Sequence, residues 1–344
     1  MTATPIIPAP RPLTEAPILR WGIIGPGGIA GHFVDAVHRQ TRQDVRAVGS
    51  RSLDRAERFA REHGIPDAVG STEALLARPD IDVVYIATPH DSHRKLAELA
   101  LQAGKHVLIE KPLATTADDA RAILALARSL GLFAMEAMWT RYLPQADIIR
   151  QLLDAGAIGD VTYVAADFGF VAPFDPRHRL FDPALGGGAL LDAGVYPVSF
   201  IESILGAPDS VSALGSLAPT GVDDHVQLTL GYDRALAAAT TSLRSALPVT
   251  AVIAGTGGRI DVHSPYIRPS GLTLSTRAMW GPDEFAAEWT DTTLARPYDG
   301  LHYEAEAAAR FIADGRIESP LHDHNATIAV IAVLEVARRQ LGAA

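Results

Sequence analysis

The glycine-rich turn at residues 25–30 constrains the fold of this chain more than any other feature of its sequence. It follows a short apolar run and has the pattern G-x-G-x-x-A where a predicted strand meets a predicted helix. Glycine lets the backbone approach a pyrophosphate closely, and the first helical turn offers unpaired N–H groups to that anion. An ordinary turn is the alternative, but the position within a strand–helix repeat favours a dinucleotide site. The residues predicted to form this site are Gly25, Gly27, Gly28, Ile29 and Ala30.

Short β-branched runs and amphipathic stretches alternate around this turn, as in a parallel sheet covered by helices. The predicted strands are Leu19–Ile24, Val45–Ser50, Val83–Ala87, His106–Glu110 and Leu132–Glu136, and the predicted helices are Gly28–Gln40, Leu53–His63, Ser92–Ala103 and Ala117–Ser129. We therefore predict an α/β chain whose residues 18–141 form a Rossmann dinucleotide-binding domain.

The pattern changes near residue 142, where strand-rich stretches separated by Gly, Pro and Asp begin. The predicted strands are Val161–Val171, Ser210–Leu217, His225–Tyr232, Ala237–Leu243, Thr250–Ala254 and Arg259–Val262, and the predicted helices are Gln145–Ala155, Tyr303–Ala313 and Asn325–Leu341. This predicts an α+β domain over residues 142–344 with a large, mostly antiparallel, open sheet. The last helix could pack back on the Rossmann domain.

Composition narrows the classes of function. The 344 residues are 48% hydrophobic and 20% charged, which is typical of globular domains, and the net charge of −10 argues against nucleic-acid or anionic-membrane partners. The absence of cysteine excludes disulfides and thiolate metal sites. Residues 1–17 contain five prolines and no basic start, so we expect a flexible or extended arm rather than a secretory signal. No membrane span is expected, and the cytoplasm is the expected location.

The end of the second predicted strand indicates which dinucleotide is bound. NAD-preferring sites usually place an acidic residue there, but this strand ends in Ser50 and Arg51, with no acid before Asp54. A guanidinium and a hydroxyl can hold a 2′-phosphate that a carboxylate would repel. The sequence therefore predicts NADP as the cofactor, with NAD as the alternative; Arg51 as a solvated surface residue is the competing interpretation.

Two later strand ends carry further polar residues. Because the carboxyl ends of parallel strands line the ligand crevice, these residues are expected to contact the cofactor. They are Thr88, Pro89, His90, His93, Glu110 and Lys111. Lys111 precedes a proline, which is consistent with a cis peptide bond, and its position alone fits a catalytic residue and a surface lysine equally well. A metal pair at His90 and His93 is disfavoured, because no cysteine or paired carboxylate accompanies them; His93 also fits a local helix residue.

These motifs, together with the segment GGGALLDAGVYP at residues 186–197, resemble the glucose-fructose oxidoreductase/inositol dehydrogenase/rhizopine catabolism (Gfo/Idh/MocA) family. The segments EAMWTR at 136–141 and RLFDP at 179–183 most resemble its branch of dimeric dihydrodiol dehydrogenases and NADP-dependent xylose dehydrogenases. The resemblance runs from about Ile18 to the C-terminus. It implies a second domain whose open sheet forms a homodimer or higher homo-oligomer, and it places the family's catalytic residues on Lys111, Asp192 and Tyr196.

Elementary chemistry agrees with these assignments. Alcohol oxidation requires hydride removal from carbon and proton removal from oxygen, and a phenol such as Tyr196 becomes a better base beside an ammonium group. Many family members have histidine in place of Tyr196, and tyrosine favours the diol and aldose branch. Without this context, a buried structural tyrosine would be the simpler interpretation. Asp192 could orient the substrate hydroxyl or hold Lys111.

Four further residues are candidates for contact with the substrate: Trp139, Arg141, Phe168 and Arg179. The aromatic pair could equally pack in the core, and Arg179 could instead cap the loop at Asp182. Two other motifs are interpreted as structural: residues 322–324 serve the last helix, and residues 255–258 form a hairpin turn.

The sequence thus predicts an NADP-dependent oxidoreductase acting on the CH–OH group of an aldose, keto-sugar or vicinal diol. The alternatives are a non-catalytic NAD(P)-binding sensor or regulator, and an NAD-dependent glycoside-cleaving enzyme on the same scaffold.

Overall fold

The computed structural model describes residues 7–11, 16–277, 283–293 and 296–344, which form two compact units. The α/β unit comprises residues 13–139 and 296–331, and the sheet unit comprises residues 1–12, 140–295 and 332–344. The sequence prediction had assigned all of 142–344 to the second domain. Residues 296–331 instead make their contacts in the α/β unit, where the N–H of Ala134 donates to the carbonyl of Ile317 (3.1 Å).

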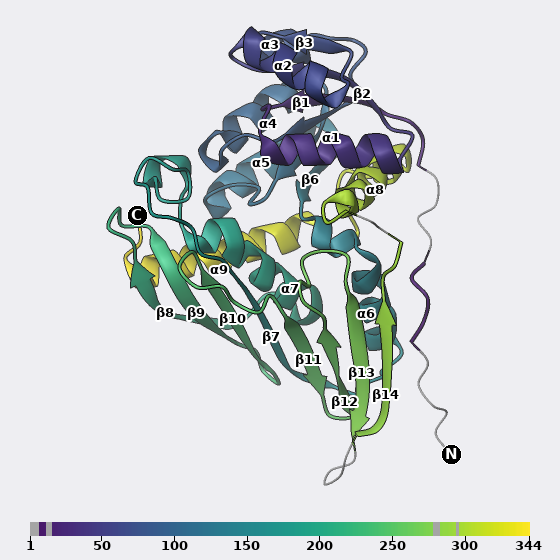
Figure 1. Ribbon diagram of the computed structural model, residues 1–344, viewed down its shortest axis with the longest axis vertical. Coiled ribbons are helices and arrows are strands. Elements are labelled where there is room, and N and C mark those ends of the chain that lie inside the picture. The colour runs from purple at the N-terminus through teal and green to yellow at the C-terminus, as the bar shows by residue number, and fades with distance from the viewer. Residues whose placement is uncertain (1–6, 12–15, 278–282, 294–295) are drawn as a thin grey trace. The chain divides into compact units, whose positions relative to one another are not determined.

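The α/β unit is built on a six-stranded parallel sheet with strand order β3-β2-β1-β4-β5-β6 (Figure 1). The strands are β1 (Arg20–Ile24), β2 (Asp44–Gly49), β3 (Asp67–Val69), β4 (Val83–Ile86), β5 (His106–Glu110) and β6 (Ala134–Ala137). This is the strand order of dinucleotide-binding sheets. In such sheets the ligand binds outside the carboxyl ends of the two central strands, which are β1 and β4 here. All residues of β4 are buried, as expected for a strand covered on both faces.

Helices connect these strands, and the four that the sequence predicted lie within one residue of their predicted bounds. They are α1 (Gly28–Gln40), α2 (Leu53–His63), α3 (Thr72–Leu76), α4 (His93–Gln102) and α5 (Ala117–Leu130), and α8 (His302–Ala313) joins them from the later stretch. Gly64 and Gly131 follow α2 and α5 in the left-handed conformation, with φ of 67° and 66°, which favours glycine. The sequence prediction missed α3 and β3, which have 5 and 3 residues.

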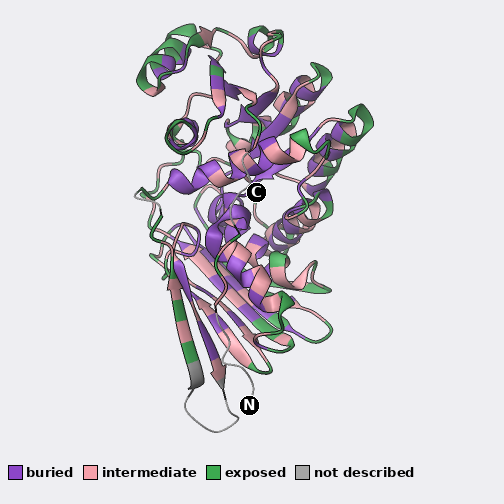
Figure 2. Cartoon of the chain, turned by 90° about the vertical axis from the view of Figure 1, so that its right-hand side faces the viewer, coloured by how far each residue is buried: buried purple, intermediate pink, exposed green. Residues whose placement is uncertain are grey.

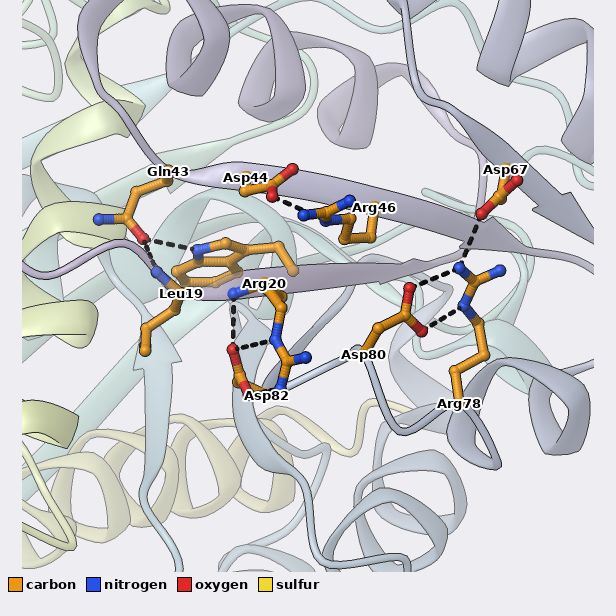
Figure 3. Close-up of polar contacts among 10 residues, drawn as sticks. Leu19, Arg20, Gln43, Asp44, Arg46, Asp67, Arg78, Asp80 and Asp82 are labelled. Atoms are coloured by element: carbon orange, nitrogen blue, oxygen red, sulfur yellow. Dashed lines mark hydrogen bonds and ion pairs between the residues drawn. The ribbon is translucent and has the colours of Figure 1, made fainter.

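Ion pairs lie along the amino-terminal edge of this sheet, opposite the crevice (Figure 3). Arg20 pairs with Asp82 at 2.6 Å, and Arg78 pairs with both Asp67 and Asp80 at 2.7 Å. These residues begin or precede β1, β3 and β4. Solvent screens these partly exposed pairs, so they contribute little to the stability of the unit.

The sheet unit contains eight strands in the order β14-β13-β12-β11-β7-β10-β9-β8 (Figure 1). They are β7 (Val161–Gly169), β8 (Ser210–Leu217), β9 (Asp223–Gly231), β10 (Leu236–Ser242), β11 (Ala251–Gly255), β12 (Gly258–Val262), β13 (Gly271–Arg277) and β14 (Asp283–Thr290). Neighbours are antiparallel except β7 and β10, which run parallel. The sequence prediction missed β13 and β14, and the predicted hairpin at 255–258 joins β11 and β12 as expected.

One face of this sheet is buried. Along β9, Val226, Leu228 and Leu230 are buried while Gln227 and Thr229 are exposed, and Figure 2 shows similar mixed burial along the other strands. Helix α7 (Val195–Leu205) packs on β7 and β10. The segment Pro183–Leu205 contains an 18-residue window with the mean hydropathy (1.3) of a membrane span, and 83% of that window is buried inside the structure, as in the core helix of a globular domain.

Residue Arg11 and the last helix both contact the sheet unit. The described residues 7–11 form no helix or strand, and Arg11 pairs with Asp147 of α6 (Pro144–Asp154) at 2.6 Å. Helix α9 (His324–Leu341) begins in the α/β unit and ends in the sheet unit, where Gln340 bonds to both the N–H of Ala213 (2.8 Å) and the carbonyl of Val211 (2.9 Å).

Candidate active site

The glycine turn between β1 and α1 has the geometry of an anion cradle. Gly25 has φ of +96°, and a Cβ there would lie 2.6 Å from the carbonyl oxygen of Ala87, so only glycine fits against the end of β4. Gly27 caps α1 without a side chain, and a Cβ added to Gly28 would meet nothing within 4 Å. The start of α1 therefore has open space beside Gly28, and its first N–H groups have no partner within the helix, which fits a dinucleotide pyrophosphate.

The end of β2 lies beside this turn, because the N–H of Gly25 donates to the carbonyl of Gly49 at 3.3 Å. Ser50 follows, and its hydroxyl accepts from the N–H of Ser52 at 3.2 Å, which shapes the turn into α2. Arg51 is exposed, so its guanidinium is accessible to a ligand held at the turn. The residues predicted to select the cofactor thus lie next to the predicted pyrophosphate cradle.

The segment after β4 is fixed by a buried histidine. The ring nitrogens of His93 lie 2.9 Å from the carbonyl oxygen of Thr88 and 3.0 Å from that of Pro112, and burial lowers the pKa of this imidazole. His93 is fully buried, so it supports the site through Thr88 and Pro112. This corrects the expectation that His93 contacts the cofactor itself. His90, one turn earlier, is half-buried, as is Thr88, while Pro89 is exposed.

Lys111 stands at the carboxyl end of β5, and the predicted cis peptide bond to Pro112 is present. Its N–H donates to Glu110 Oε2 at 3.1 Å, and the hydroxyl of Tyr85 donates to Glu110 Oε1. Burial raises the pKa of the Glu110 carboxyl. Glu110 is therefore held inside the unit, while the half-buried Lys111 remains at the strand end.

The rings of Trp139, Tyr298 and His32 form an aromatic stack next to the end of β6. Trp139, which follows β6, is buried, and its ring lies 6.2 Å from that of Tyr298. On the other side Tyr298 stacks on His32 of α1, with ring centroids 4.0 Å apart and planes 6° from parallel. Sequence reasoning named Trp139 but missed Tyr298 and His32, because nothing in the sequence near 298 indicates a return to α1.

In the sheet unit, the predicted catalytic pair lies on one helical segment. Asp192 is in a π-helical turn (Leu190–Gly194), and Tyr196 follows in the first turn of α7. Such turns frequently occur at functional sites. The ring of Phe168 meets Tyr196 edge-on, with centroids 5.4 Å apart. Asp192, Tyr196 and Phe168 are thus gathered at the start of α7.

Arg179 pairs with Asp192 at 2.7 Å between Nη1 and Oδ1. The loop at Asp182 is capped instead by Asp182 itself, whose carboxylate accepts from the N–H of Ala184 (2.9 Å). The alternative role for Arg179 as a cap for that loop is therefore wrong, and Arg179 belongs with the polar group at Asp192.

Arg141 has a structural role. Its side chain is 6% exposed, donates to Ser199 at 2.9 Å and pairs with Glu202 at 2.6 Å, both on α7. The expectation that Arg141 contacts the substrate is corrected: the guanidinium is engaged by the helix that carries Tyr196. Sequence spacing could not show this, because the direction of the side chain depends on the packing of α7.

Four buried acidic residues were missed by sequence reasoning: Glu136, Asp223, Asp299 and Glu304. Asp223 accepts from the N–H of Leu190 at 2.6 Å at the start of the π-helical turn, and burial raises its pKa to about 6. His322 pairs with Glu136, while Asp323 accepts from the N–H of Ala326 (2.8 Å), which confirms its role at the start of α9. Among the residues that the structure describes, no group of His, Asp and Glu is arranged to hold a metal ion.

Comparisons with known proteins agree with this geometry. Residues 19–138 match the model of an oxidoreductase family with an NAD-binding Rossmann fold, and residues 147–261 match the GFO/IDH/MocA C-terminal domain. The chain is 36% identical to the trans-1,2-dihydrobenzene-1,2-diol dehydrogenase of Mus musculus, over 94% of this chain and 97% of that protein. It is 37% identical to the protein of the same name from Xenopus tropicalis, over 94% and 98%.

Among solved structures, the chain is similar to a 3-ketoreductase from Actinomadura kijaniata in complex with NADP and TDP-benzene. The TM-score is 0.79 at 27% sequence identity, covering 94% of this chain and 98% of the other. The chain thus has a Rossmann fold, a glycine turn that fits a dinucleotide and Lys111 at the end of β5. The proteins that it resembles are oxidoreductases.

Proposed function

Because the chain belongs to the Gfo/Idh/MocA family of NAD(P)-dependent oxidoreductases, we propose that it transfers a hydride between NADP and an aldose, keto-sugar or vicinal diol. The observation that carries this proposal is the open α1 terminus at Gly28, which stands on the same sheet edge as Lys111. The names of relatives supply the substrate class, since they act on a cyclic diol and a keto group.

The α/β unit would hold the cofactor. The start of α1 would hold its pyrophosphate, and Arg51 and Ser50 would hold a 2′-phosphate. Thr88, Pro89 and His90 follow β4, which lies between β1 and β5 in the sheet, and would contact the same cofactor. When bound, the nicotinamide accepts or donates the hydride, and the protein manages the accompanying proton.

Lys111 and Tyr196 would manage that proton. In the oxidative direction the Tyr196 phenolate, stabilised by the Lys111 ammonium, would take the proton from the substrate hydroxyl and become the phenol. Asp192, held by Arg179, accepts a hydrogen bond from a second hydroxyl of the substrate. Phe168 and Trp139 offer aromatic faces to the sugar or diol ring.

A direct test is the absorbance of NADPH on mixing the protein with NADP and a panel of pentoses, hexoses and diols. Turnover with at least one of these compounds is expected. The variant K111A should lower kcat about 10²–10⁴-fold, the usual contribution of a positioned proton-transfer group. The exposed Lys95 provides the matched control K95A, which should keep wild-type kcat. Tight NADP binding without turnover over the whole panel would favour a sensor or regulator.

The glycoside-cleaving alternative predicts a different outcome. It requires tightly held NAD after purification and release of free sugar without net NADPH production. Ser50 and Arg51 at the end of β2, and the tyrosine at 196, make this alternative less consistent with the sequence.

We further propose a homodimer or higher homo-oligomer formed through the open face of the sheet unit, in the cytoplasm. The exposed side chains Leu214, Leu236 and Tyr163 on β8, β10 and β7 support such an interface. Mass measurement in solution for wild type and L214E tests it: L214E should shift the population to monomer.

A further inference from the structure

Three glutamates are buried together inside the α/β unit. Glu110 ends β5, Glu136 lies in β6 and Glu304 lies in the first turn of α8. Their exposed fractions are 6%, 0% and 0%. Three carboxylates in one interior region cannot all be ionised without large cost, unless each has a partner.

Two of the three have partners that stabilise a negative charge. Glu110 accepts from Tyr85 and from the N–H of Lys111. Glu136 accepts from the N–H of Leu113 at 2.8 Å and contacts His322 Nε2 at 2.7 Å. Both carboxyl groups are therefore held by donors in fixed positions.

Glu304 differs from its neighbours. Neither of its carboxyl oxygens has a hydrogen-bond partner among the residues that the structure describes, although the side chain is fully buried. Burial first, and then the charges of Glu110 and Glu136, raise the pKa of Glu304 well above its ordinary value. An unpaired charge here would be repelled by both neighbours.

We propose that Glu304 binds one proton on folding and acts as a positioning residue for Glu110, the carboxyl group next to Lys111. A neutral Glu304 adds no third negative charge to the cluster. Only the link to Lys111 rests on the proposed function; the uptake of a proton does not.

The surroundings of Glu304 are consistent with a neutral acid. The charged and titratable groups next to the cluster are Tyr85, Glu110, Lys111, Glu136 and His322. On α1, which packs against α8, Arg39 pairs with Asp299 at 2.6 Å and Asp35 pairs with His63 at 2.8 Å. The same helix carries His32, which stacks on Tyr298, and His38, whose pKa is lowered by burial. On α8 itself, His302 contacts the carbonyl of Asp299 and Glu306 contacts Gln43, and the helix also carries Tyr303 and Arg310.

The test compares urea unfolding of wild type and E304Q between about pH 5.5 and 7.5. Glutamine has the shape of the protonated acid but cannot release a proton. The unfolding equilibrium constant of wild type relative to E304Q should rise about tenfold per pH unit, because the unfolded chain releases the proton that the folded chain retains. The control is E57Q, which removes a solvated carboxylate of α2 whose side chain is 48% exposed and should give a ratio independent of pH.

Infrared spectroscopy near pH 7.5 gives a second measurement. Wild type should show the C=O band of a protonated carboxyl, which E304Q lacks and E57Q retains. If E304Q does not fold, E304L replaces it in both experiments. A pH-independent stability ratio, or the absence of the Glu304 band, would overturn the proposal.

Kinetics separate this inference from the proposed function. E304A, which leaves a hole behind Glu110, should lose more kcat than E304Q, which preserves a neutral polar side chain there. Greater loss in E304Q than in E304A would contradict the positioning role. If the protein turns over no substrate at all, the proposed function fails, while the unfolding and infrared results still decide whether Glu304 carries a proton.

Discussion

Arg179 Nη1 lies 2.7 Å from Asp192 Oδ1, four residues before Tyr196. Asp192 is nearly buried, whereas the Arg179 side chain is 49% exposed, so one partner is fixed and the other is accessible to solvent. With this difference in exposure, Arg179 can fix the Asp192 carboxylate at a substrate site while contributing little to the free energy of folding.

Replacing Arg179 by alanine should therefore affect catalysis more than stability. We expect R179A to lower kcat/KM about 10–100-fold, which corresponds to a hydrogen bond to a charged group of roughly 1.5–3 kcal/mol. Its Tm should change by no more than a few degrees. Steady-state kinetics with thermal unfolding test this, with exposed Arg177 as the control R177A. Unchanged kinetics would remove Arg179 from the site.

Arg51 should decide between the two dinucleotides. R51A is expected to raise the KM for NADP at least about tenfold, because a charge-assisted bond to the 2′-phosphate is lost, and to leave the KM for NAD nearly unchanged. Parallel kinetics with both cofactors provide the measurement. Arg58, exposed on α2, is the matched control. An equal effect on both cofactors would mean that Arg51 does not contact the phosphate.

The ion pair of Arg141 with Glu202 should stabilise the sheet unit. R141A leaves Glu202, whose side chain is only 13% exposed, without its cation, and removes a donor to Ser199. We expect a loss of about 3 kcal/mol in the free energy of unfolding by urea. The exposed pair Arg121–Asp118 offers the control R121A, which should cost less than about 1 kcal/mol. Similar losses in both variants would contradict the buried role.

Asp223 should make the stability of the protein depend on pH. Burial raises its pKa from 3.8 to about 6. As pH increases, this carboxyl group therefore loses its proton at a lower pH in the unfolded chain than in the folded one. The contribution to stability therefore falls between about pH 4 and 6, by about 3 kcal/mol in total, and is constant above that range. The asparagine variant D223N should lack this slope relative to wild type in urea unfolding at several pH values. Asp233, exposed before β10, provides the control D233N; a D223N slope equal to that of D233N would disprove the assignment.

Much of the α/β unit could be predicted because its signals are local. The spacing of apolar residues gave β5 and α2 their observed bounds, and the glycine pattern located the cradle at Gly25. The family resemblance supplied Lys111, Asp192 and Tyr196, and the structure gathers Asp192 and Tyr196 with Phe168 at the start of α7.

What could not be predicted depends on contacts distant in sequence. Glu304 is buried on α8, and Asp223 is buried beside Leu190, which lies 33 residues earlier; both have sequence neighbours typical of solvated positions. Arg141 was assigned to the substrate as the last residue of a family motif, yet its partners Ser199 and Glu202 lie 58 and 61 residues later. Strand β13 and the edge strand β14 were also missed.

The return of residues 296–331 to the α/β unit limits how this protein can be engineered. A fragment ending at residue 139 would lack His322, which pairs with the buried Glu136, and would also lack helix α8. Chimaeras with relatives must therefore exchange residues up to 139 and residues 296–331 together, because the α/β unit is formed by two separate stretches of the chain.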